Sequence, residues 1–334
     1  MQEIEAAVPA VRKLLADANL IILITHKGPD GDAIGSLTAT ALALRQLGKD
    51  VILACDDPAP PQVAFLPLVD EVVLPGQRNG MPPELVIALD CGDLDRLGRS
   101  FSTLPAPAPP IINIDHHRTN TRFGNVNIVA SGAAATTEML YHLLRAIDVD
   151  LTSDIAQCLL TGLITDTLGF RTSSVTADTV AVGSALMAAG ANLAQITETA
   201  LNVKPLSVLK LYRIGLNNLQ MQDGFLWTTV SNEERQETGH QLASSAGLVT
   251  MLGNVQEAKI GCVMIEMEER IYVGFRCRAP WDVATLATEL GGGGHQFAAG
   301  CSLEKPLAVA ETTVLSHALA DLVRQQAQLE TADD

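Results

Sequence analysis

The sequence lacks any pair of closely spaced cysteines. Its six cysteines show neither a Cys-x-x-Cys pair nor zinc-ligand spacing, and they stand at Cys55, Cys91, Cys158, Cys262, Cys277 and Cys301. This pattern argues against a disulfide framework and favours reduced thiols in a reducing compartment. We therefore expect the protein to be cytoplasmic.

Long apolar runs are also absent. No run approaches the roughly 20 residues that cross a membrane. Residues 1–5 lack the basic start and apolar stretch of a secretion signal. We expect a soluble protein with no membrane partner.

Positive charge is scarce, because 22 Lys and Arg residues face 38 Asp and Glu residues, giving a net charge of -16. Neutralising many backbone phosphates requires a basic surface, so this balance argues against binding to long duplex nucleic acid. An acidic protein can still handle phosphate through bound cations or a small basic pocket. The length of 334 residues, 47% of them hydrophobic, favours two domains.

The first half of the chain alternates short apolar runs with helical patterns. The runs are typical of parallel strands covered on both faces, and they lie at residues 20–24, 51–54, 85–89 and 111–114. Apolar residues at helical spacing predict helices at 33–47, 133–147 and 155–165. The pattern indicates an α/β domain with a parallel sheet and helices on both of its faces.

The second half predicts a smaller α/β domain, with a cleft between the two. Strand-like segments lie at residues 225–230, 260–266 and 271–275, and helical patterns lie at 205–219, 283–290 and 307–323. We predict a catalytic, metal-binding domain at residues 1–195, a helical linker at 196–219 and a substrate-binding domain at 220–330.

Acidic and histidine side chains gather where the predicted strands end. The residues are His26, Asp30, Asp32, Asp90, Asp115, His116 and His117, and Asp166 ends an apolar helix. Each alone has an ordinary explanation, such as a turn, a helix cap or a polar loop. The carboxyl ends of parallel strands converge at one edge of a sheet, so together these side chains predict a common site.

Such a cluster of buried acids repels itself unless cations hold it. Carboxylates mixed with imidazoles, without thiolate, suit manganese best, with magnesium or cobalt as alternatives. The ligands exceed what one ion needs, so we predict two divalent cations about 3.5 to 4 Å apart.

Five segments resemble the motifs of the DHH/DHHA1 phosphoesterases, a RecJ-like family. The segments are residues 26–36, 89–90, 114–127, 162–171 and 291–300, in the family's order. The resemblance implies one metal held by His26, Asp30 and Asp90, and a second held by Asp32, Asp90, His116 and Asp166. It also implies that Asp90 bridges the metals, that His117 contacts the phosphate or acts as general acid, and that Asp115 orients the histidines. A hydroxide between the metals would attack the phosphorus.

The glycine-rich segment of the second half predicts a substrate-binding loop. Backbone N–H groups at Gly292, Gly293 and Gly294, with His295, suit a phosphate, although four glycines also suit a flexible turn. Arg276 and Arg278 point the same way if their run is extended, and they are either phosphate ligands or an exposed pair. Phe297 suits either base stacking or core packing, and Trp281 either lines the cleft or packs in the core.

The resemblance implies hydrolysis of short oligoribonucleotides, as a nanoRNase, with or without a phosphatase activity on adenosine 3′,5′-bisphosphate. A second interpretation is hydrolysis of cyclic di-AMP or its linear product pApA by the same centre. A third is a non-catalytic nucleotide sensor, which the complete ligand set disfavours. Cleavage polarity and a homodimer through apolar helices such as residues 133–147 stay open.

Overall fold

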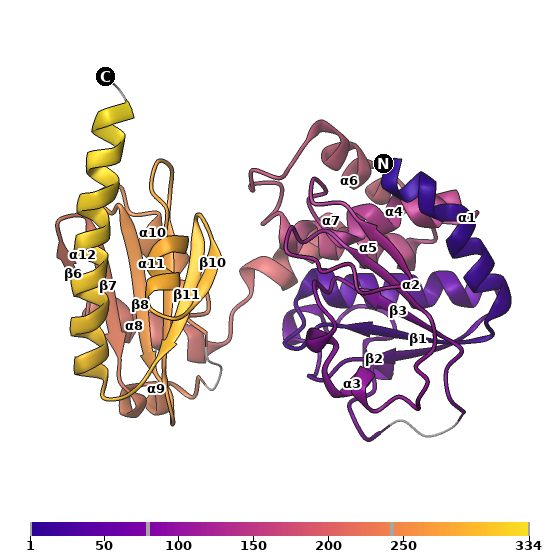
Figure 1. The fold of residues 1–334 in the computed structure, drawn as a ribbon, viewed down its shortest axis with the longest axis horizontal. Coiled ribbons are helices and arrows are strands. Elements are labelled where there is room, and N and C mark those ends of the chain that lie inside the picture. Colours follow the sequence, from indigo (N-terminus) through magenta and orange to yellow (C-terminus); the bar gives the residue numbers. More distant parts are fainter. Residues whose placement is uncertain (1, 78–80, 241–243, 333–334) are drawn as a thin grey trace. The chain divides into compact units, whose positions relative to one another are not determined.

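The chain forms two compact units in the computed structural model, Met1–Val203 and Lys204–Asp334 (Figure 1). The structure describes residues 2–77, 81–240 and 244–332. Each unit has its own sheet and its own core, so we describe them separately. The domain boundaries given above, with a linker at residues 196–219, stay a prediction.

The first unit contains a five-stranded sheet in the order β2-β1-β3-β4-β5, and every pair of neighbours is parallel. Its strands are β1 (Leu20–Thr25), β2 (Asp50–Ala54), β3 (Leu85–Leu89), β4 (Ile111–Asp115) and β5 (Val126–Val129). The predicted parallel sheet is therefore confirmed. The sequence did not predict β5, because Asn127 interrupts its short apolar run.

Helices cover both faces of this sheet. They are α1 (Gln2–Asp17), α2 (Gly31–Gln46), α3 (Gly98–Ser102), α4 (Thr136–Ala146), α5 (Ser153–Asp166), α6 (Ala177–Ala188) and α7 (Leu193–Ile196). Ile21 and Leu23 of β1 face the core formed with α2, α4 and α5, whereas Ile22 and Ile24 face the side that holds α3 (Figure 1). Because successive residues face opposite cores, residues 20–24 of β1 are apolar on both faces.

Two glycines allow α2 and α5 to pack closely. A Cβ atom on Gly35 would lie 2.6 Å from the carbonyl oxygen of Cys158, and one on Gly162 would lie 2.6 Å from Oδ1 of Asp32. Real side chains do not tolerate such distances. The absence of side chains at these positions therefore lets the start of α2 approach the end of α5.

The apolar stripe of α4 lies inside the first unit. Met139, Leu140, Leu143 and Leu144 are at most 3% exposed and belong to its main core. These side chains are therefore unavailable for the dimer contact that the sequence left open on residues 133–147.

The second unit contains a six-stranded sheet in the order β10-β11-β9-β8-β7-β6. Its strands are β6 (Gln220–Gln222), β7 (Phe225–Val230), β8 (Ile260–Glu266), β9 (Ile271–Cys277), β10 (Gly293–His295) and β11 (Ala298–Leu303). Neighbours are antiparallel except β7 and β8. The predicted second α/β domain is confirmed, although the sequence missed the short strands β6 and β10 and the Ala- and Gly-rich β11.

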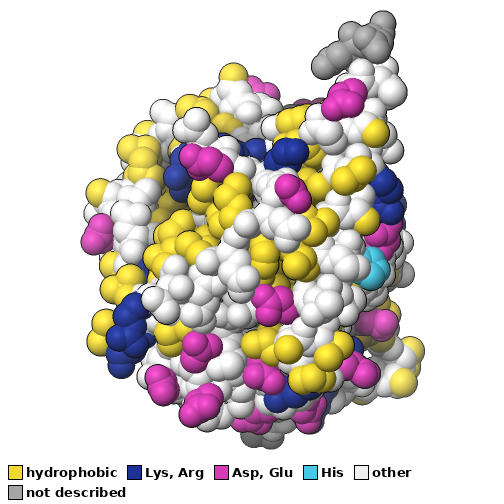
Figure 2. Space-filling view, turned by 90° about the vertical axis from the view of Figure 1, so that its left-hand side faces the viewer, with side chains coloured by type: hydrophobic (Ala, Val, Ile, Leu, Met, Phe, Trp, Pro, Cys, Tyr) yellow, Lys and Arg dark blue, Asp and Glu magenta, His cyan; other side chains and the backbone are white. Residues whose placement is uncertain are grey.

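The helices of the second unit are α8 (Leu206–Asn217), α9 (Asn232–Thr238), α10 (Leu248–Gly253), α11 (Ala284–Glu289) and α12 (Leu307–Ala332). Figure 2 shows the face that carries α12, where patches of hydrophobic side chains lie among acidic ones and a few basic ones. Exposed apolar residues of this unit include Val309, Val323 and Met221.

In the parts of the chain that the structure describes, no single helix is long and apolar enough to cross a membrane. Ala177–Ala188 and Leu193–Asn202 meet the length and composition criteria only as a pair, and they are bent by 112°.

Candidate metal centre

Three parallel strands deliver polar side chains to one edge of the first unit's sheet. His26 follows β1, Asp90 follows β3, and β4 ends at Asp115, which His116 follows. Parallel strands present their carboxyl ends together, so side chains that are distant in sequence meet here. The structure brings these side chains together, as the strand ends predicted, and their role as a site stays a proposal.

The first turn of α2 and the last residue of α5 complete the cluster. Asp30 is the N-cap of α2, and its Oδ1 accepts hydrogen bonds from the N–H groups of Asp32 and Ala33, each at 3.0 Å. Close packing of α2 on α5 brings Asp32 and Asp166 to the same place.

Histidine and carboxylate atoms lie within a few ångströms of one another in the cluster. Nε2 of His26 is 3.5 Å from Oδ2 of Asp90, and Nε2 of His116 is 3.7 Å from Oδ1 of Asp90. The same His116 nitrogen is 3.5 Å from Oδ2 of Asp166. His116 and Asp90 therefore stand between the two ends of the cluster.

The ligand atoms form compact groups that could each hold an ion. Atoms of His26, Asp30 and Asp90 lie within 4.8 Å of one another, and so do atoms of Asp32, His116 and Asp166. A third group joins Asp90 with His116 and His117. The first group is the first predicted ligand set, and the second is the other predicted set without Asp90. The first predicted set is therefore compact as a whole, and the second is compact for three of its four residues; the ligand roles themselves stay a proposal.

Backbone carbonyls orient two of the histidines. Nδ1 of His26 lies 2.9 Å from the carbonyl oxygen of Lys27, and Nδ1 of His116 lies 3.3 Å from that of Ala133. If Nδ1 carries the proton and donates it, Nε2 keeps a lone pair that faces the carboxylates. Metal-binding histidines are commonly oriented in this way.

Two threonines that the sequence analysis missed hold the buried acids. Asp32 accepts hydrogen bonds from the N–H groups of Thr136 and Thr137 at 2.7 and 3.0 Å, and from the Thr137 hydroxyl at 2.7 Å. The Thr136 hydroxyl donates to Asp90 at 2.9 Å. In the sequence, the only sign of this role was that the two threonines form a polar pair shortly before the apolar stripe of a predicted helix.

Asp115 is fully buried and binds His117 and Asn120. Nδ1 of His117 lies 2.7 Å from Oδ1 of Asp115, and the Asn120 amide donates to Oδ2 at 2.6 Å. The same amide donates to Asn113 at 2.8 Å. The sequence analysis missed both asparagines, although Asn113 is the one polar residue among the isoleucines of residues 111–114.

The backbone of Asp90 is strained. Its φ of +54° lies in the left-handed region, which only Gly, Asn and Asp visit with any ease. Residues held in such conformations cluster at functional sites. Burial would raise the pKa of Asp90, but His26, His116 and His117 lower it to about 2.

The electrostatics of the cluster show crowding of negative charge. Burial and the neighbouring Asp90 and Asp166 raise the pKa of Asp32 well above its usual value. Burial also raises the pKa of Asp166 to about 6, despite the opposing effect of His116. Burial lowers the pKa of His116, but the surrounding acids outweigh it and raise that pKa to about 9.

Neighbouring carboxylates also raise the pKa of two further histidines. Burial lowers the pKa of His26, but the hydrogen bond and charge of Asp90 outweigh it and raise the pKa. The hydrogen bond to Asp115 raises the pKa of His117. Oxygen and imidazole donors crowded in this way suit divalent cations, which would relieve the repulsion between the acids.

In the second unit, the glycine-rich segment forms part of a hairpin. Gly293, Gly294 and His295 make strand β10, which pairs with β11 at the sheet edge. The expected loop is therefore partly an edge strand. A Cβ atom on Gly292 would overlap the carbonyl oxygen of Gly300, whereas one on Gly293 would meet nothing within 4 Å, which leaves room for a ligand.

The two predicted arginines lie at the end of β9. Arg276 belongs to the strand, and Arg278 follows its last residue, Cys277. Arg276 donates to the carbonyl oxygen of Phe275 at 2.9 Å, and burial lowers its pKa. The Arg278 guanidinium donates a hydrogen bond to the carbonyl oxygen of Val255 at 2.8 Å.

The two aromatic residues of this region differ in surroundings. Trp281 packs against the core of the second unit, and Nζ of Lys259 lies 4.8 Å from its ring centroid. Phe297 is 39% exposed. Core packing therefore accounts for Trp281, whereas Phe297 has an accessible ring.

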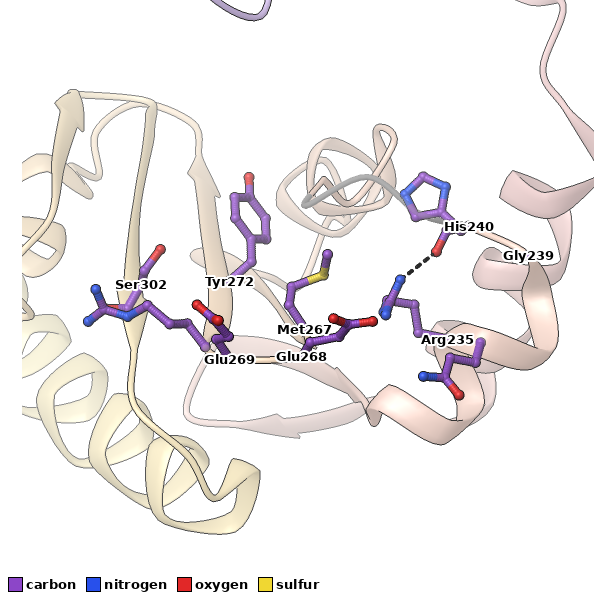
Figure 3. A pocket seen from close by; sticks show the side chains of 10 residues that line it. Arg235, Gly239, His240, Met267, Glu268, Glu269, Tyr272 and Ser302 are labelled. Carbon is purple, nitrogen blue, oxygen red and sulfur yellow. Dashed lines mark hydrogen bonds between the residues drawn. The ribbon is translucent and has the colours of Figure 1, made fainter.

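A cavity of about 680 Å³ in the second unit lies apart from these residues (Figure 3). The predicted site residues do not occur among the described residues that line it. Its buried Arg235 donates to the carbonyl oxygen of His240 at 2.9 Å and to Asn232 at 2.8 Å. We interpret Arg235 as a structural link between α9 and the following loop.

Comparisons with known proteins agree with the fold. Residues 20–163 match the model of the DHH family, N-terminal domain, and residues 229–324 match that of the DHHA1 domain. A crystal structure of an exopolyphosphatase-related protein from Bacteroides fragilis superposes with a TM-score of 0.88 at 23% identity, covering 97% of this chain and 98% of that one.

Two curated relatives carry the name bifunctional oligoribonuclease and PAP phosphatase NrnA. The one from Thermus thermophilus is 33% identical, over 85% of this chain and 84% of its own length. The one from Bacillus subtilis is 26% identical, over 85% of this chain and 89% of its own length. The fold, the cluster and these relatives define the class of a metal-dependent phosphoesterase, a hydrolase. The chain belongs to the DHH/DHHA1 family.

Proposed function

We propose that the protein hydrolyses short oligoribonucleotides, as a nanoRNase, and adenosine 3′,5′-bisphosphate, using two divalent cations, preferably manganese. The observation that carries the proposal is the convergence of two adjacent ligand groups, one of His26, Asp30 and Asp90, the other including His116 and Asp166. Relatives whose names state both activities support the choice of substrates.

The residues of this chain have separate tasks in the proposed reaction. Asp90 serves both ligand groups, because His26 and His116 approach its two carboxylate oxygens. When bound, the cations would activate water and offset charge on the phosphoryl oxygens. His117, held by Asp115, would contact the phosphate or donate a proton to the leaving oxygen. Manganese is preferred because the donors are carboxylates and imidazoles without thiolate.

The glycine hairpin of the second unit would bind the substrate. Gly293 and Gly294 would line the substrate with backbone groups, and His295 and Arg276 would add side-chain donors. The predicted N–H contact at Gly292 is not available, because that N–H already donates to the carbonyl oxygen of Ala287 at 2.8 Å. We expect His295→Ala to raise KM with little change in kcat, because it removes a binding contact. A fall in kcat alone would instead move His295 into the chemistry.

The test is an assay of the purified chain with Mn²⁺ against RNAs of two to five nucleotides, adenosine 3′,5′-bisphosphate, pApA and cyclic di-AMP. Turnover of the RNAs and the bisphosphate supports the proposal. Turnover of cyclic di-AMP or pApA alone would favour the alternative phosphodiesterase. No turnover with Mn²⁺ bound, measured as bound metal per chain, would favour a nucleotide sensor.

A further inference from the structure

A cavity of about 740 Å³ adjoins His117 in the first unit, and the proposed chemistry does not use it. Its lining comes from α1, from the segments after β4 and β5, and from α4 and the start of α6. The volume falls within the range of about 300 to 1,000 Å³ that is usual for small-molecule sites. The cavity is therefore large enough for a nucleotide beside the reacting phosphate.

Arg118 gives this cavity an available cation. It follows His117 directly, its side chain is exposed, and it forms no hydrogen bond or ion pair with any residue that the structure describes. Arg122 also lines the cavity but is engaged, because its Nη2 lies 3.5 Å from Oε1 of Glu3. A guanidinium without a partner is well suited to bind a phosphate.

The acids of the cavity are mostly occupied. Glu3 faces Arg122, and buried Glu138 accepts hydrogen bonds from the Ala134 N–H at 2.6 Å and the Thr179 hydroxyl at 2.9 Å. The third acid, Asp178, is exposed in the first turn of α6. Two of the three carboxylates in the lining are therefore already paired.

Apolar and aromatic groups complete the lining. Ile4, Val129 and Met139 are buried and form an apolar wall, and His142 contributes a partly exposed ring. Unstacked nucleobases bind to surfaces of this kind by stacking on rings and apolar side chains. An available guanidinium beside an apolar wall matches the two chemical halves of a nucleotide.

We infer that this cavity binds a second nucleotide of a short RNA whose scissile phosphate lies at the metal centre. The next phosphate along the strand, after the scissile one, contacts Arg118, and the base of that second nucleotide lies against the partly exposed ring of His142. Adenosine 3′,5′-bisphosphate has one nucleoside and cannot occupy both places. The inference rests on the proposed function. It makes contacts in this cavity the reason that the enzyme would prefer short RNA to adenosine 3′,5′-bisphosphate.

The test compares a trinucleotide RNA with adenosine 3′,5′-bisphosphate in the Arg118→Ala variant with Mn²⁺. We expect KM for the trinucleotide to rise, and the ratio of kcat/KM values, trinucleotide to bisphosphate, to fall about 10-fold. Arg118→Lys should restore part of this ratio. Arg99→Ala is the matched control, because Arg99 on α3 is exposed, its side chain has no partner among the described residues, and it lies outside the cavity.

A second variant fills the cavity without removing charge. A Cβ atom on Gly132 meets nothing within 4 Å, so a side chain can begin there without a clash, and Gly132→Trp is chosen to place a ring in the lining. We expect the same fall in the ratio. An unchanged ratio in both variants, with a wild type that hydrolyses both substrates, overturns the inference and leaves the proposed function standing. A wild type that hydrolyses neither substrate overturns the proposed function itself.

Discussion

Nδ1 of His117 lies 2.7 Å from Oδ1 of Asp115, and Asp115 is completely buried. A second hydrogen bond, from Asn120 at 2.6 Å, holds the other oxygen of the same carboxylate. The pair fixes the orientation of the imidazole and leaves its Nε2 free for a phosphate. The hydrogen bond to the carboxylate also raises the pKa of His117, which favours a protonated ring.

We predict that Asp115→Asn lowers kcat about 10- to 100-fold, the usual effect of losing such an orienting partner. The amide keeps the size of the side chain but removes the charge that stabilises the imidazolium. Steady-state kinetics on a dinucleotide and an NMR titration of His117 would measure both effects, and the pKa should fall. Asn120→Ala is the control with the smaller expected loss. Wild-type kcat in Asp115→Asn would show that His117 does not depend on this contact.

Asp90→Asn should abolish hydrolysis and lower the amount of bound Mn²⁺. Asparagine tolerates the left-handed backbone at this position, so the variant tests the charge rather than the fold. Activity and metal content per chain should fall together, because Asp90 faces both His26 and His116. Asp95→Asn, at an exposed position, is the matched control. Equal turnover by wild type and Asp90→Asn would refute the proposed ligand role.

Gly35→Ala should destabilise the protein by about 1 to 3 kcal/mol, the usual cost of overpacking a core. The new Cβ atom would meet the carbonyl oxygen of Cys158 and push α2 away from α5. Because that contact sets the approach of Asp32 to Asp166, Mn²⁺ affinity should weaken as well. Chemical denaturation and a metal titration measure the two effects. Gly132→Ala, where the added atom meets open space, should leave stability unchanged, and an equal loss in both would contradict the packing argument.

The metal-free protein should lose stability as the pH rises from about 6.5 to 9. His116 has a pKa of about 9 in the folded state, above its ordinary value of 6.5, so the folded state holds a proton that the unfolded state has released. Asp166 has a pKa of about 6, above its ordinary value, so it also lowers stability as the pH rises, here from about pH 4 to pH 6. Asp90, with a pKa of about 2, acts oppositely, and its contribution is lost as the pH falls from about 4 towards 2.

Thermal unfolding with a chelator at pH 6 to 9 checks this prediction. In His116→Asn the Tm should change less with pH, because the substitution removes the titrating group. Added Mn²⁺ should raise the Tm most at the alkaline end, since metal ligands must be deprotonated to bind. A Tm that rises with pH in the metal-free wild type would mean that other groups dominate.

Much of the first unit could be predicted from local patterns. The strands β1 and β3 are apolar runs, β4 is one that only Asn113 interrupts, and His26, Asp90 and Asp115 mark their ends. The carboxyl ends of parallel strands lie at one edge of the sheet, so the sequence alone predicted that these side chains lie close together. Strand β5 and the short strands β6 and β10 were missed, because their residues show no apolar run or clear alternation.

The sequence by itself determined which residue types meet at the metal centre, because strand ends and family motifs are local properties of the chain. Only the tertiary structure decided how they are held: Thr136 and Thr137 bind the buried acids, and Asn120 binds Asp115. It also decided that Arg118 lies beside a cavity and has no side-chain partner among the residues that the structure describes. These features depend on contacts between elements that are distant in sequence, and such contacts leave no periodic pattern in the chain.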